Sequence, residues 1–186
     1  ADTSSSLASI LGLTSPPDLA CLLGVARARA RWHLGDVTGA RDELQTIVAW
    51  TGVDPLWQLE AVGALALLEA WAGNLLRAHR YAAHALLAAQ RLGLDRHVAT
   101  LDTRLALAHL ALEQHQLRRA AAILDHVADA PPGPRAGSVA DLATLERVRL
   151  HLSSNTPLRG LAELQRHRRD AATAPSPAIA QRLAAV

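Results

Sequence analysis

The chain has 186 residues, of which 50% are hydrophobic, and a formal net charge of +2. It contains no Phe or Met, and all 19 of its basic residues are Arg. The dominance of Ala and Leu favours helices over a β-sandwich, and the absence of Lys excludes a Walker A phosphate loop and a Schiff-base enzyme.

Taken in chain order, the sequence predicts a partly ordered lead-in over residues 1–17 and a helical domain over 18–186. The predicted helices come in pairs and cover 19–34, 37–50, 56–72, 75–92, 96–114, 117–130, 139–152 and 158–172. Residues 131–137 form a loop rich in Pro and Gly, after which Ser138 is the expected N-cap. A last helix begins near Pro177 and is still apolar at Val186, so we expect it to be truncated and the chain to be a fragment of a longer regulator.

A six-residue pattern recurs four times between the helices of these pairs. It begins with a turn-forming residue at Gly35, Gly73, His115 and Asn155, and it ends with a small residue at Ala40, Ala78, Ala120 and Gly160. We call the four small residues the anchor residues; they are 38, 42 and 40 residues apart. Small or apolar residues also recur 12 residues before and four residues after each anchor, where helices would pack closely. The pattern predicts an all-α solenoid of about four helix pairs plus the truncated last helix.

The turn motif, Gly-Asp or Gly-Asn followed by three residues and Ala, resembles the tetratricopeptide repeat, although its spacing exceeds the usual ~34 residues. Longer units rich in Ala, Leu and Arg look like the sensor domain of the large ATP-binding LuxR-type regulators of the STAND class, typified by the maltose-regulon activator. The resemblance covers about residues 18–186. It implies a right-handed superhelix that binds a small inducer, often a sugar, or a regulatory protein. It also implies a nucleotide-binding switch domain and a helix-turn-helix domain elsewhere in the full chain.

In tetratricopeptide solenoids the first helix of each pair lines the concave surface. Counting back 18, 15, 11, 8 and 7 residues from each anchor therefore nominates an inward-facing set. Its polar and aromatic members, our candidate ligand-binding residues, are Arg29, Trp32, His33, Glu60, Trp71, Asp102, His109, Glu113 and Arg149. Indole faces beside charged groups suit a sugar or another polar effector. The same residues could hold a peptide, and either Trp could instead fill the core. Arg27, Arg31 and Arg41 are expected on solvated helix faces.

Other chemistries find no support in the sequence. Cys21, the only cysteine, lies in an apolar run and is expected to be a buried thiol. No nucleophile elbow or His-Glu-x-x-His motif is present, so we expect no enzyme activity, no metal and no cofactor in this fragment. The low net charge argues against direct contact with nucleic acid, and no apolar run approaches the ~20 residues of a membrane span.

These observations predict a cytoplasmic, ligand-sensing domain of a multidomain bacterial transcriptional regulator that binds a small polar effector such as a sugar. The alternative is a protein–protein interaction scaffold that binds a peptide or a partner domain in the same groove.

Overall fold

A computed structural model describes residues 16–129 and 136–170 of the chain, and this described part is all-helical. The elements are α2 (Pro16–His33), α3 (Val37–Val48), α4 (Pro55–Trp71), α5 (Leu75–Arg91), the short 3-10 helix η1 (Val98–Thr100), α6 (Leu101–Glu113), α7 (Leu117–Ala128), α8 (Ala136–Ser153) and α9 (Pro157–Asp170). The first of them begins two residues before the expected domain boundary. The predicted helix after Pro177 lies outside the described residues.

Three predicted helix starts are wrong. Helix α2 begins at Pro16 rather than at residue 19. Helix α8 begins at Ala136, so Ser138 lies in its first turn rather than at its N-cap. The helix predicted from residue 96 begins as η1, because the Nδ1 atom of His97 accepts a bond from the N–H of Ala99 at 3.2 Å and holds a tighter turn.

The turn between the two helices of a pair has the same geometry all four times. The residue that begins each sequence pattern has a positive φ, 91° at Gly35, 79° at Gly73, and 55° at both His115 and Asn155. The backbone N–H of this residue donates a hydrogen bond to the carbonyl three residues earlier. The N–H of the following residue donates to the carbonyl five residues earlier, as Asp36 does to Arg31 at 2.9 Å. This left-handed C-cap satisfies the last carbonyls of the first helix, so the predicted turns are confirmed.

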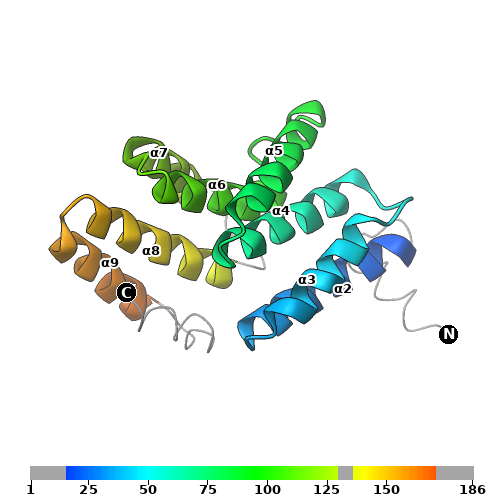
Figure 1. The fold of residues 1–186 in the computed structure, drawn as a ribbon, viewed down its shortest axis with the longest axis horizontal. Coiled ribbons are helices and arrows are strands. Elements are labelled where there is room, and N and C mark those ends of the chain that lie inside the picture. The colour runs from blue at the N-terminus through cyan, green and yellow to red at the C-terminus, as the bar shows by residue number, and fades with distance from the viewer. Residues whose placement is uncertain (1–15, 130–135, 171–186) are drawn as a thin grey trace.

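Each first helix packs against its own second helix and against the first helix of the next pair. Figure 1 shows the pair α2–α3 and the pair α8–α9 at opposite ends of the described structure, with α4 and α6 between them. All residues from 59 to 70 of α4 are buried, because α2, α3, α5 and α6 surround it. All four anchor residues are buried, which confirms the expected close packing at these positions.

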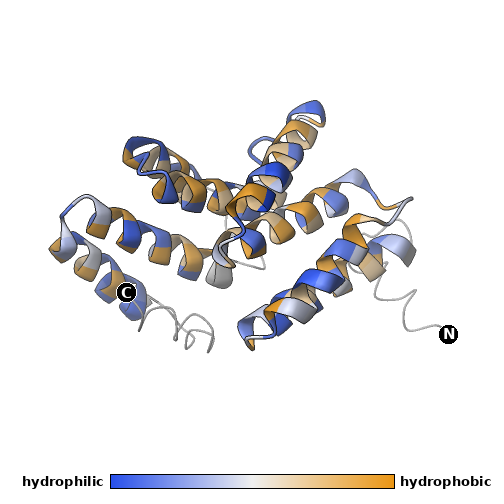
Figure 2. Ribbon diagram, in the orientation of Figure 1, coloured by the Kyte–Doolittle hydropathy of each residue, from blue (hydrophilic) through white to orange (hydrophobic). Residues whose placement is uncertain are grey.

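Hydrophobic residues recur along every helix and alternate with hydrophilic ones (Figure 2). The main core joins residues of every α-helix from α2 to α8. Within the described residues, no helix combines the length and the apolar character needed to cross a membrane.

A buried carboxylate ties the second pair to the first. Glu69 of α4 is fully buried, and its Oε1 accepts a bond from Nε of Arg41 on α3 at 2.9 Å. Its Oε2 accepts a bond from Nδ2 of Asn74 at 2.6 Å, so the Asn74 side chain does not cap α5. Arg41 was expected on a solvated face; the structure corrects this, because the partner carboxylate is buried.

Candidate binding site

The nine candidate residues all belong to the first helices of the pairs, and the structure divides them into two clusters. The first cluster comprises Arg29, Trp32, His33, Glu60 and Asp102, from α2, α4 and α6. The second comprises Trp71, His109, Glu113 and Arg149, from α4, α6 and α8. Side chains far apart in the sequence therefore meet in two places.

Arg29 is the centre of the first cluster. Its Nη1 donates to Oε1 of Glu60 at 3.0 Å, and its Nη2 contacts the carboxylate of Asp102. Both carboxylates are buried. Burial alone would lower the pKa of Arg29, but Asp102 and then Glu60 more than offset this and raise it. One guanidinium therefore joins three successive first helices.

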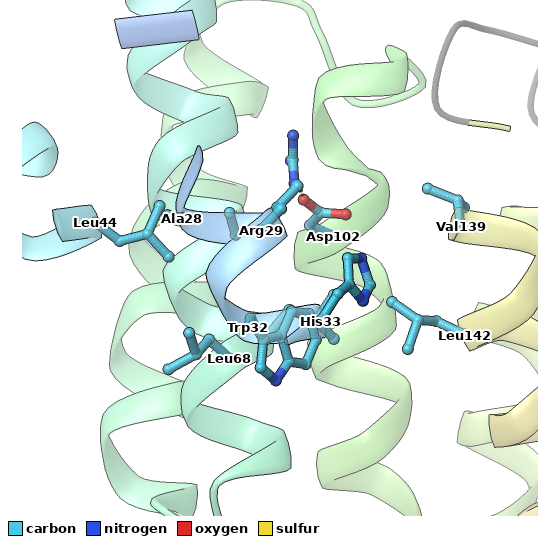
Figure 3. A pocket seen from close by; sticks show the side chains of 11 residues that line it. Ala28, Arg29, Trp32, His33, Leu44, Leu68, Asp102, Val139 and Leu142 are labelled. Atoms are coloured by element: carbon cyan, nitrogen blue, oxygen red, sulfur yellow. Dashed lines mark hydrogen bonds and ion pairs between the residues drawn. The ribbon is translucent and has the colours of Figure 1, made fainter. Parts of the chain in front are cut away.

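A small cavity lies beside this ion pair, between the end of α2 and the beginning of α8. The rings of Trp32 and His33 are stacked, with centroids 5.7 Å apart and an interplanar angle of 16°. Figure 3 shows Val139 and Leu142 of α8 on the other side of the cavity from these rings. The cavity measures about 10 Å³, which is room for one water at most.

The second cluster joins α6 to α8. Nδ1 of His109 lies 2.8 Å from Oε1 of Glu146 and 2.8 Å from Nη1 of Arg149. Arg149 also donates to Oε2 of Glu146 at 3.0 Å and contacts the Glu113 carboxylate through Nη2. The indole of Trp71 packs on the His109 ring, with centroids 5.2 Å apart. The tautomer of His109 decides whether its Nδ1 donates to the carboxylate or accepts from the guanidinium.

The sequence prediction missed Glu146, which is fully buried in the second cluster. The available signal was its position three residues before Arg149, which places both on one helix face. Trp32 is a buried member of the main core, and Trp71 packs against that core while half-buried. The alternative that a Trp fills the core therefore applies to Trp32, although Trp32 also borders the cavity.

The described residues contain no group of three His, Cys, Asp or Glu side chains that could hold a metal ion. Burial, followed by the charges of Glu60 and Asp18, raises the pKa of the Cys21 thiol to about 11. Cys21 is buried as expected, and near neutral pH it is a thiol rather than a nucleophilic thiolate.

No family model, no curated protein and no solved structure gives a significant match to this chain. The resemblance of the turn motif to the tetratricopeptide repeat thus stays a prediction, and functional inference depends on the geometry of the two clusters.

Proposed function

We propose that the chain is a right-handed solenoid of tetratricopeptide-like hairpins that senses a small polar effector on its concave face. Three features support the architecture: one turn geometry used four times, buried anchor residues at regular spacing, and packing of each pair on the next. A crystal structure of the chain tests the handedness directly.

The observation that carries the sensing role is the joining of α2, α4 and α6 through Arg29, with α8 closing the cavity beside it. A molecule bound at this place touches first helices from all four pairs. Its binding energy therefore depends on how the pairs are arranged. A ligand shifts a conformational equilibrium only by its differential affinity for the two states, and a site shared by four pairs provides such a difference.

The effector chemistry follows from the lining. The stacked plane of Trp32 and His33 offers an aromatic face for an apolar surface, and Arg29 with Asp102 offers hydrogen-bonding groups for hydroxyls or amides. A cavity of about 10 Å³ is too small for a sugar. Entry of an effector of that size requires α8 to move away from α2, and we propose this movement as the signal.

Calorimetric titration of the chain with monosaccharides, disaccharides and other polar metabolites tests the proposal. We expect saturable binding that Asp102→Asn weakens at least tenfold, with Asp129→Asn, an exposed carboxylate after α7, as the matched control. Thermal melts of both variants check that they fold. Equal affinity in the two variants counts against effector sensing at this site, and so does the absence of binding of every tested compound to the wild type.

The chain would act as the sensor of a cytoplasmic, multidomain transcriptional regulator, a proposal that follows from the resemblance of its repeats. The full gene tests this cheaply, because a phosphate-binding loop upstream and a helix-turn-helix downstream are both required. One observation favours a protein scaffold instead: Leu34 and Leu158, close to two hairpin turns, are 78% and 81% exposed. If Leu158→Gln abolishes capture of a purified partner while no metabolite binds, the scaffold is the better description.

A further inference from the structure

The three junctions between helix pairs share one construction. The second helix of a pair packs against the first helix of the next, as α3 on α4, α5 on α6 and α7 on α8. Polar side chains link two of these junctions. Arg41 of α3 reaches Glu69 of α4. In the other direction, Arg147 of α8 donates to the Leu124 carbonyl at 3.0 Å and to Oδ1 of Asp125 at 3.3 Å, both on α7.

Within residues 16–129 and 136–170, no helix lies on the matching face of the first pair. Arg27 precedes its anchor residue by the same number of residues as Leu65 and Arg147 precede theirs, so the three are equivalent positions of the repeat. In the same way, Arg31 is equivalent to Glu69. Leu65 and Glu69 are fully buried under the preceding pair. In contrast, the side chains of Arg27 and Arg31 are 69% and 46% exposed. Among the described residues, no helix covers this face as α3 covers α4.

A groove of about 330 Å³ runs along this face between α2 and α3. We call it the α2–α3 groove; the residues that matter to its chemistry are Arg27, Arg31, Asp42, Glu43, Ile47 and Trp50. Ile47 is buried, and Trp50 is half-buried. Glu43 contacts the Nε atoms of both Arg27 and Arg31. Among the described residues, no other carboxylate pairs with the Nη groups of Arg27.

We propose that the α2–α3 groove binds an amphipathic helix of a partner protein that presents a carboxylate to Arg27. The helix would sit as α7 sits on α8, with Arg27 in the role that Arg147 has toward Asp125. Its apolar side chains would cover Trp50, which is half-buried. A nucleic acid fits this surface less well, because Asp42 and Glu43 on the α3 side repel phosphates and the apolar surface gains nothing from them.

A helix-stapled, fluorescently labelled peptide with the sequence of residues 117–128 is a suitable probe, because it carries Asp125 and already packs in this geometry on α8. Fluorescence anisotropy measures its binding to the full chain. We expect saturable binding that Arg27→Glu weakens at least tenfold and Arg27→Gln weakens less. A peptide with Asp125→Arg should bind the Arg27→Glu chain more tightly than it binds the wild type.

The control variant is Arg147→Glu, which changes the corresponding residue at the α7–α8 junction. Unchanged peptide affinity in this variant supports the α2–α3 groove. Loss of binding in Arg147→Glu but not in Arg27→Glu means that the peptide replaces the native α7, and it overturns the proposal. Absence of peptide binding to the wild type, or binding of a DNA duplex that depends on Arg27 instead, overturns it as well.

Discussion

The contact between Gly63 of α4 and Thr103 of α6 makes a specific prediction about the centre of the fold. A Cβ atom added to Gly63 would lie 2.8 Å from Oγ1 of Thr103 and 3.3 Å from its backbone nitrogen. Rotating the Thr103 side chain cannot relieve the second contact. Gly63→Ala therefore requires α4 and α6 to separate slightly, and both helices are buried at this place.

The expected magnitude is the sum of two opposing effects. Overpacking a close-packed interior costs about 1–3 kcal/mol, while replacing Gly by Ala inside a helix gains about 1 kcal/mol. We expect a net loss of about 0–2 kcal/mol in the free energy of unfolding. For a chain of this size, the upper value corresponds to a fall in the melting temperature of about 4–8 °C.

Differential scanning calorimetry of Gly63→Ala, Thr103→Ala and the double variant measures the effect. Thr103→Ala removes the clashing hydroxyl, which is buried with no hydrogen-bond partner among the described atoms, so the double variant should recover at least half of the loss. Gly24→Ala is the control. Its Cβ would lie only 2.6 Å from an Ile47 atom, but that atom is the mobile Cδ1 end of a side chain. We expect the Gly24→Ala melting temperature to change by less than half as much, and the opposite ranking would refute the reasoning.

Three further predictions concern turns, a buried ion pair and the thiol. His115→Gly should raise the melting temperature and Gly73→Ala should lower it, because a positive φ costs an L-residue about 1–2 kcal/mol; calorimetry checks both. Arg41→Met should destabilise by about 3 kcal/mol in urea titrations, since it strips a buried carboxylate of its cation, and Glu69→Gln should restore part of this. The folded chain keeps the Cys21 proton up to a pKa of about 11, whereas the ordinary value is 9.0. The unfolded chain thus loses that proton first, and the free energy of unfolding should fall between pH 9 and 11 by an amount that is absent in Cys21→Ala.

The sequence pattern predicted the turns and the buried small positions because both depend on local chemistry. A positive φ needs Gly or a tolerant polar residue, and a close helix contact needs a small side chain, so Gly35 and Ala40 carry their structural roles in their identity. Helix starts were less predictable. The start at Leu101 depends on hydrogen bonds of His97 and Thr100 that compete with a regular first turn.

The pairing of charges within the site could not be predicted. Counting from the anchor residues places Arg29, Glu60 and Asp102 on one face, but it does not say that one guanidinium reaches both carboxylates. That result depends on the angle and offset between successive pairs, which side-chain packing sets. The same limit explains why Arg41, predicted to be solvated, instead pairs with buried Glu69.

Both clusters use α6, and this shared helix suggests how they communicate. Asp102 belongs to the first cluster and His109 to the second, and seven residues of helix place them about 10 Å apart on the same face. A displacement of α6 that weakens the contact between Arg29 and Asp102 therefore also changes the contact between His109 and Arg149 of α8. Independent sites this far apart should be additive within about 0.5 kcal/mol. We expect the double variant Asp102→Asn/Arg149→Gln to depart from additivity by more than this in urea denaturation, and simple additivity would show that α6 does not couple the two clusters.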